Sequence, residues 1–256
     1  MFSRIIRYSH TSTSCIALTF SLLATGLSAL AQVGEHRNTL SIGGSAGWNM
    51  TTVGFMPKVP QSMQGGLTFG LTARYTSEKY FSSICAIEGE VNISHTGWRE
   101  NILDIHDRPI SLASDTTQAI AYQRKLTYVQ IPILARMGWG RETRGLQFFV
   151  HAGPQLGILI GEATESNFDL QTPLHNRRVS NVVAQDTMAV ERKVDYGIMA
   201  GAGLEWSHPA VGHFMLEGRY YYGLGDLFGN SKRDYFGRSN LGIITVKLTY
   251  LFDIMR

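Results

Sequence analysis

The sequence predicts an all-β fold, an eight-stranded, antiparallel, up-and-down transmembrane β-barrel. Eight segments alternate apolar and polar side chains with the period of two that a β-strand requires. The apolar face of each segment carries almost no charge, whereas acids and bases gather on the other face. The connections alternate between long and short, as they do in barrels inserted from the periplasmic side of an outer membrane.

The first 31 residues have the organisation of a secretory signal peptide. Arg4 and Arg7 give a positive start, residues 15–27 form an apolar run, and residues 29–31 form a small-x-small cleavage site. The run is shorter than the ~20 apolar residues that a membrane-spanning helix needs. We therefore expect cleavage near Ala31, with residues 1–31 as the signal peptide and residues 32–256 as the barrel domain.

The first four predicted strands cover residues 40–48, 67–75, 81–93 and 128–137. In the last of these, Val129, Ile131 and Ile133 share an apolar face, and Gln130 and Arg136 lie on the other face. The stretches between these strands are predicted to be a long loop, a short turn and a second long loop, at residues 49–66, 76–79 and 94–123.

The last four predicted strands cover residues 147–156, 196–206, 214–222 and 244–252. Long polar loops are predicted at residues 162–192 and 223–238, with short turns between the other pairs. Both termini should then lie on the periplasmic side. Aromatic residues near the strand ends fit the girdles at the two membrane interfaces: Trp48, Tyr75, Trp206, Tyr220, Tyr222 and Tyr250.

A soluble eight-stranded barrel of the lipocalin kind is the competing fold, because alternation alone does not say which face is inside. A soluble barrel buries its apolar face and leaves its charges in water. The near absence of charge from the apolar face in every segment favours lipid outside instead.

Nine ionisable residues share the predicted inward face: Arg74, Glu88, Glu90, Arg136, His151, Glu205, Glu217, Arg219 and Lys247. An eight-stranded barrel has an interior just wide enough for side chains to fill. We expect these residues to pair across the lumen and close it, because unpaired buried charges are strongly unfavourable. The alternative is a path for protons or a small solute.

Composition and motifs point away from catalysis, nucleic acid and cofactors. Glu88 and Glu90 share a face as a general acid and base would, but the nearby bases explain them as ion-pair partners. His151 has no Ser and acidic residue beside it at the spacing of a triad. Removal of Arg4 and Arg7 lowers the formal charge from +3 to +1, and no basic face remains for nucleic acid. Asp104, His106 and Asp107 in a long loop could bind a metal, but loops are rich in Asp and His in any case. We expect no enzyme, no cofactor and no metal site.

Four segments together resemble the PorT-like outer-membrane β-barrel family of Bacteroidetes: residues 128–136, 151–157, 195–205 and 219–224. They are similar to its "Y-hydrophobic-x-IP-aliphatic", "aGPxxG", "DxG…GaGxE" and "RYxxGL" patterns. The resemblance implies an outer-membrane barrel, and its founding member is implicated in protein secretion to the cell surface. No catalytic residues carry over. The chain departs from many such barrels in continuing past Phe252, the aromatic residue expected to serve as the signal for the barrel-assembly machinery.

The expected function is structural or partner-binding, in the outer membrane of a Gram-negative bacterium. The long loops at residues 94–123 and 162–192 would meet secretion-system or surface partners, and lipid would surround the barrel. The alternatives are an accessory of a secretion system, a lipid-modifying enzyme and a narrow solute channel.

Overall fold

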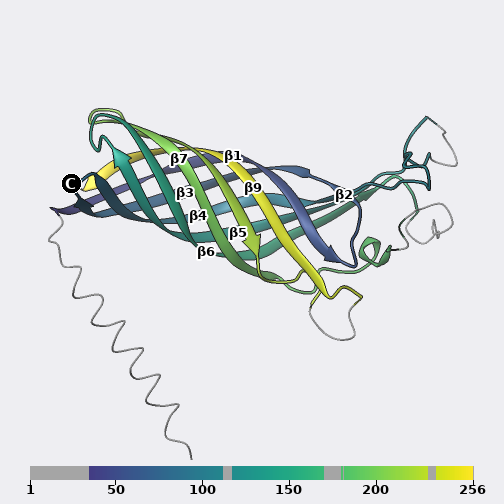
Figure 1. Ribbon diagram of the computed structural model, residues 1–256. Helices are drawn as coiled ribbons and strands as arrows, with labels where there is room; N and C mark the ends of the chain where they lie inside the picture. Colours follow the sequence, from purple (N-terminus) through teal and green to yellow (C-terminus); the bar gives the residue numbers. More distant parts are fainter. Residues whose placement is uncertain (1–34, 112–116, 170–179, 181, 230–234, 256) are drawn as a thin grey trace, which may run out of the picture. The chain divides into compact units, whose positions relative to one another are not determined.

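The computed structural model describes residues 35–111, 117–169, 180, 182–229 and 235–255 (Figure 1). The predicted signal peptide and its cleavage site lie outside these residues. The strands are β1 (Glu35–Met56), β2 (Gln61–Ser62), β3 (Gln64–Tyr80), β4 (Ser83–Glu100), β5 (Tyr122–Gly140), β6 (Gly145–Ser166), β7 (Val194–His208), β8 (Gly212–Gly223) and β9 (Arg238–Met255). A short 3-10 helix, η1, covers Ala184–Asp186.

The long strands form a closed ring. Their order is β4-β3-β1-β9-β8-β7-β6-β5, and β5 pairs back with β4. The two-residue strand β2 pairs with the end of β4 and stays outside the ring. The first and last long strands meet in an antiparallel seam that runs from Leu40 opposite Met255 to Met56 opposite Arg238. The predicted eight-stranded, up-and-down barrel is thereby confirmed.

The two faces of each strand divide as the alternation predicted. Outward side chains are apolar and exposed, for example Leu71 at 72%, Ile133 at 56% and Leu248 at 63%, whereas inward polar side chains are buried. A continuous apolar outer surface of this size is stable in lipid and not in water. The soluble alternative is therefore wrong. Within the described part of the chain, no helix is long and apolar enough to cross a membrane.

Aromatic side chains mark the short-turn side of the outer surface. The ring of Phe214 lies 5.9 Å from Trp206 and 4.9 Å from Tyr250, and the Tyr250 hydroxyl donates to the Val211 carbonyl at 2.6 Å. An apolar ring with a hydrogen-bonding tip suits the membrane interface. Trp48 is also exposed, but it lies in the middle of β1 and not near its end.

Several strands are longer than the alternation predicted. β1 continues to Met56 and β3 begins at Gln64, so most of the predicted loop at residues 49–66 is strand. Trp98, assigned to a loop, lies on β4 and is fully buried. Phe81, assigned to the third strand, lies in a turn with φ of 50°. Beyond the lipid the outer face of a strand no longer needs to be apolar, so the alternation that identifies a membrane strand disappears there.

The barrel has two different ends. The turn end holds the short connections at residues 81–82, 141–144 and 209–211, the start of β1 and the end of β9. The loop end holds the long connections. There, strand residues such as Phe55 and Trp98 pack with Phe228 and Phe236, with ring centroids 5.0–6.2 Å apart. Ile102, Ile110, Ile120 and Val190 of the long loops join the same buried core, which we call the loop-end cap.

Candidate functional site

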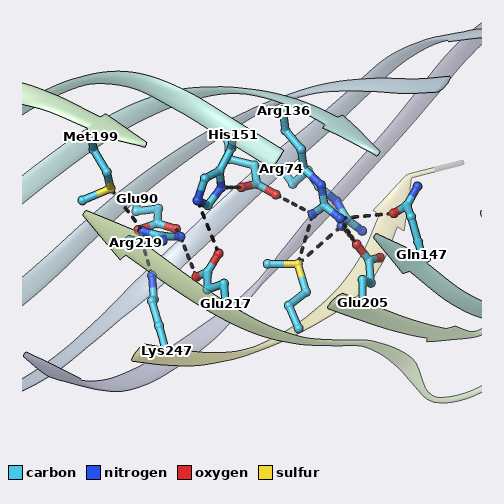
Figure 2. Close-up of polar contacts among 12 residues, drawn as sticks. Arg74, Glu90, Arg136, Gln147, His151, Met199, Glu205, Glu217, Arg219 and Lys247 are labelled. Carbon is cyan, nitrogen blue, oxygen red and sulfur yellow. Dashed lines mark hydrogen bonds and ion pairs between the residues drawn. The ribbon is translucent and has the colours of Figure 1, made fainter. Parts of the chain in front are cut away.

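All nine predicted lumen residues point into the barrel, and each is at most 5% exposed. They come from seven strands, because a strand places alternate residues on the same face. The contributing strands are β3 (Arg74), β4 (Glu88 and Glu90), β5 (Arg136), β6 (His151), β7 (Glu205), β8 (Glu217 and Arg219) and β9 (Lys247). Their mutual contacts form two clusters joined by a histidine (Figure 2).

The first cluster is centred on Glu90. Both of its carboxylate oxygens accept hydrogen bonds from the Arg219 guanidinium, at 2.6 and 2.7 Å, and one also accepts from Lys247 Nζ at 2.8 Å. Arg219 also lies 2.6 Å from Glu217. A bidentate arginine–carboxylate pair is among the stronger polar contacts in proteins, so this cluster fixes β4, β8 and β9 to one another across the lumen.

The second cluster is centred on Arg136. Its guanidinium donates to Glu88 at 2.7 Å, to Gln147 at 3.1 Å and to Glu205. Arg74 donates to the same Glu205 oxygen at 2.7 Å. The guanidinium of Arg136 also lies 3.8 Å from the ring centroid of Phe149, a cation–π contact that helps to hold the charge in place.

His151 links the two clusters. Its Nδ1 lies 3.3 Å from Glu88, and its Nε2 lies 3.8 Å from Glu217. The nine residues therefore form one continuous chain of polar contacts along the lumen. Four of them are Arg or Lys and four are Glu, so their formal charges balance when His151 is neutral.

The sequence did not lead us to predict the polar contacts at the turn end of the lumen. His213 Nδ1 lies 2.6 Å from Glu205, and its Nε2 lies 3.0 Å from Asp253. Asp253 in turn accepts a hydrogen bond from the Ser41 hydroxyl at 2.6 Å. The signal for His213 was present in the sequence, because it shares the inward alternation of Glu217 on β8.

Ser207, His213 and Asp253 lie in the order of a hydrolase triad, with the Ser207 hydroxyl 2.9 Å from His213 Nδ1. However, the same nitrogen faces the Glu205 carboxylate at 2.6 Å, and the Ser207 hydroxyl donates to that carboxylate at 3.1 Å. Ser207 is also 1% exposed. A nucleophile needs a free base and access to a substrate, and Ser207 has neither here.

A cavity of about 380 Å³ lies at the turn end of the lumen, next to the second cluster. Arg74, Arg136 and Glu205 line it, and the part-exposed ion pair of Arg37 and Glu142, 3.0 Å apart, stands among its other lining residues. The nine contacting lumen residues thus lie between a polar cavity at the turn end of the barrel and the loop-end cap at the other end.

Arg124 holds the loop-end cap together. Its guanidinium donates to the backbone carbonyls of Gln185, at 3.2 Å, and Met188, and it pairs with Glu162. It also lies 5.6 Å from the Trp98 ring centroid. Gln185 is fully buried, and its carbonyl also accepts a hydrogen bond from the Tyr122 hydroxyl, so η1 packs against β5 at the loop end.

Residue 124 lies next to the predicted loop at residues 94–123, so Arg124 was not predicted to point into the barrel. Its alternation with Arg136 on the longer strand β5 was the available signal.

The remaining predictions concern the loops and the C-terminus. Asp104 accepts backbone hydrogen bonds from His106 at 2.7 Å and Arg108 at 3.0 Å, and these bonds lower the pKa of its carboxyl group. No group of three or more His, Cys, Asp or Glu residues able to hold a metal ion occurs in the described part of the chain. Phe252 lies on β9 with its side chain outward and 46% exposed. Parts of both long loops, residues 112–116, 170–179 and 181, lie outside the described ranges.

Residues 30–229 match the family described as the outer membrane protein beta-barrel domain. The chain belongs to this family. The closed sheet and its apolar outer face agree with that assignment, and the protein is an outer-membrane β-barrel.

Solved structures that match this chain include the outer membrane protein OprG and two further proteins. OprG from Pseudomonas aeruginosa is 9% identical, with a TM-score of 0.43 over 86% of this chain and 98% of that one. Neisserial surface protein A is 8% identical, with a TM-score of 0.39 over 83% and 97%. Ail of Yersinia pestis is 14% identical, with a TM-score of 0.33 over 84% and 99%. Comparison with curated proteins gave no match.

Proposed function

We propose that this outer-membrane barrel does not conduct solutes and instead carries an ordered binding platform on the cell surface. In barrels of this class the long loops are extracellular and the short turns periplasmic. The loop end would then face outward. The observation that carries the proposal is the loop-end cap, which fills the barrel mouth with side chains and also anchors the described parts of the long loops.

The lumen supports the non-conducting part of this proposal. Its charges contact one another, as Arg219 and Glu217 do at 2.6 Å, and are almost completely buried. Opening a continuous water path would separate these partners, and removal of one partner from a buried pair typically costs about 3–5 kcal/mol. The extracellular exit would still be blocked by the fully buried rings of Trp98 and Phe228.

The loop after β4 supports the binding part. Ile102 and Ile110 anchor it in the cap, and the backbone amide of Ile110 donates to the Ile102 carbonyl at 3.3 Å. Between them, the bonds accepted by Asp104 fix a turn that leaves Ile105 80% exposed. A loop that is already ordered loses less entropy on binding, which favours affinity for a partner.

Conductance across a planar lipid bilayer tests the lumen. Purified barrel, shown to be folded by its faster migration when unboiled, should insert without producing conductance steps. Steady single-channel steps from the wild-type chain would overturn the proposal and favour a narrow solute channel.

Labelling of intact cells tests the orientation. In a Cys85→Ser background, Ile105→Cys at the loop end should react with a membrane-impermeant maleimide. Ala210→Cys, at the turn end, should react only after the outer membrane is permeabilised. The reverse pattern would place the platform in the periplasm.

The PorT-like resemblance supports a second candidate role, as an accessory of a secretion system in a Bacteroidetes outer membrane. Its basis is the order of four motifs along the chain, at residues 128–136, 151–157, 195–205 and 219–224. Purification from native membranes in mild detergent tests this role. Recovery of periplasmic or secreted proteins, beyond the barrel-assembly machinery, would support it, and recovery of the barrel with lipid alone would count against it.

We also propose that the barrel is not an enzyme. The Ser207 hydroxyl of the triad-like cluster is buried, and the side chains of His151 and Glu88 contact each other and further lumen residues. Ser207→Ala and His151→Ala variants should leave the lipid composition of the outer membrane unchanged. A lipid conversion lost in either folded variant would contradict this and favour a lipid-modifying barrel.

A further inference from the structure

The cavity at the turn end of the lumen has the size of a small-molecule site. Its volume is about 380 Å³, and ligand pockets typically measure about 300–1,000 Å³. Exposed residues at the start of β1 and in the turn between β5 and β6 line its mouth, for example His36, Asn38 and Thr143. Among the described lining residues, Ile84 and Ala86 are apolar and the others are polar or charged. A ligand for this cavity would therefore be small and polar.

The carboxylates that line the cavity already have partners within the barrel. Each contacts an arginine or histidine side chain: Glu142 contacts Arg37, Glu205 contacts Arg74, and Asp253 contacts His213. A cationic ligand would have to displace one of these side chains from its carboxylate. The cavity is therefore poorly suited to a cation.

Arg74, in contrast, keeps one edge of its guanidinium group without a partner. Its Nη1 donates to Glu205 at 2.7 Å (Figure 2) and lies 3.6 Å from the Met215 sulfur. Its Nε has no hydrogen-bond partner among the described residues, and its contacts with them do not use Nη2. Nε and Nη2 share one edge of the guanidinium, where two parallel N–H groups match the two oxygens of a carboxylate. The Arg74 side chain is buried, and a buried donor without a partner is unfavourable.

The neighbouring Arg136 has no such edge to offer. Its Nη1 donates to Glu88 at 2.7 Å, and its Nη2 donates to Gln147 at 3.1 Å and to Glu205. Phe149 covers its guanidinium, with 3.8 Å between the guanidinium carbon and the ring centroid. Of the two buried arginines that line the cavity, Arg74 is therefore the one that can receive an anion.

We propose that the turn-end cavity binds a small carboxylate from the periplasm, held by the Nε and Nη2 edge of Arg74. In barrels of this class the short turns face the periplasm. Thr39 and Thr76 line the same cavity, so a hydroxy acid or an amino acid would find partners for its polar substituent. This site lies at the opposite end of the barrel from the proposed binding platform, and the inference does not rest on that platform.

A carboxylate suits the site better than a phosphate group does. One guanidinium edge offers two parallel donors and shares its single positive charge with Glu205. A phosphate carries up to two negative charges, and the carboxylates of Glu205 and Asp253 in the same cavity wall would repel the second.

Ligand titration of the full barrel in nanodiscs, followed by saturation-transfer NMR, tests the proposal. Lactate is the probe, and lactamide, which has the same shape without the charge, is the matched control. Lactate should bind about tenfold more tightly or better, because only a carboxylate can pair with the guanidinium edge as an ion. Equal binding of the two compounds, or no binding of either, would overturn the proposal. Tighter binding of inorganic phosphate than of lactate would overturn the choice of a carboxylate.

The same carboxylate chemistry could come from a free acid or from the C-terminus of a peptide. Acetyl-trialanine with a free C-terminus separates these sources. Weaker binding of this peptide than of lactate would support a free acid. Tighter binding, lost when its C-terminus is amidated, would support a peptide end held by the same edge of Arg74.

Arg74→Lys is the decisive variant, because it keeps a positive charge beside Glu205 and removes the two-donor edge. It should weaken lactate binding about tenfold, and unchanged affinity would overturn the inference. Arg99→Lys is the matched control: Arg99 is exposed at the loop end, where it donates to Gln123 at 2.8 Å, and this variant should bind lactate like the wild type. Faster migration of unboiled samples shows that each variant is folded. If Arg74→Lys does not fold, Ala86→Leu, which narrows the cavity from its apolar wall, should abolish lactate binding.

NMR of isotope-labelled arginine side chains reports on the site itself. The Nε–H signal that is missing from Arg74→Lys, or from the spectrum of the folded variant closest to it, should shift during lactate titration, whereas the signal of Arg219 in the first cluster should stay in place. A shift of the Arg219 signal with a fixed Arg74 signal would put the ligand elsewhere in the lumen and overturn the inference. Conductance of the same preparation bears only on the proposed function, so the two proposals can fail separately.

Discussion

Ser41 on β1 donates a 2.6 Å hydrogen bond to Asp253 on β9, across the seam where the first and last strands close the barrel. His213 on β8 lies 3.0 Å from the same carboxylate. Asp253, the residue after Phe252, therefore links β1, β8 and β9 on the inside of the seam.

Asp253→Ala should remove these contacts across the seam. Hydrogen bonds to charged groups contribute about 1.5–3 kcal/mol, so the variant should lose about that much free energy of unfolding. Urea unfolding of the barrel in lipid, followed by the loss of fast migration on gels, measures the change. Ile254→Ala, whose side chain is 56% exposed on the outer face, is the matched control and should stay near the wild type. Equal losses in both variants would mean that β9 contributes through its backbone alone.

Glu90→Gln should destabilise the barrel more strongly. The change leaves Arg219 and Lys247 without their shared carboxylate in a buried site, which typically costs about 3–5 kcal/mol. Glu165→Gln breaks the exposed pair with Lys125 and should cost little, because water screens such pairs. Unfolding both variants in urea compares them directly. A small loss for Glu90→Gln would show that solvent in the lumen replaces the missing partner.

The membrane part of the fold was predictable because lipid imposes a simple rule on each strand. Outside the lipid the outer face no longer has to be apolar, so the predicted strands stop short of the real ones. β1 continues past Trp48, and Trp98 is buried on β4 instead of lying in a loop. Alternation placed the inward charges on one face, but pairing them requires the register between strands. Glu90 on β4 meets Arg219 on β8 only because β3, β1 and β9 complete the ring between these two strands, and local sequence does not carry that information.

Arg124→Ala should loosen the loop-end cap without opening the barrel wall. The guanidinium holds the carbonyls of Gln185 and Met188, so its loss should free the segment around η1. Trypsin should then cut faster at the exposed Arg192 and Lys193, as followed by mass spectrometry of the fragments. The unboiled gel shift should persist. Arg124→Lys keeps the charge but not the fork of donors and should be intermediate. Unchanged cleavage in Arg124→Ala would mean that the apolar core alone holds the loop-end cap together.

Gly201→Ala should disturb the link between the two lumen clusters. A Cβ at this position would lie 2.6 Å from His151 Nε2 and 2.7 Å from the Gly218 carbonyl, which is too close for either to remain in place. Overpacking of this kind costs about 1–3 kcal/mol. Gly218→Ala is the matched control on the neighbouring strand, because its Cβ would meet nothing within 4 Å. Urea unfolding should separate the two variants, and a stable Gly201→Ala barrel would show that His151 can move without cost and does not couple the clusters.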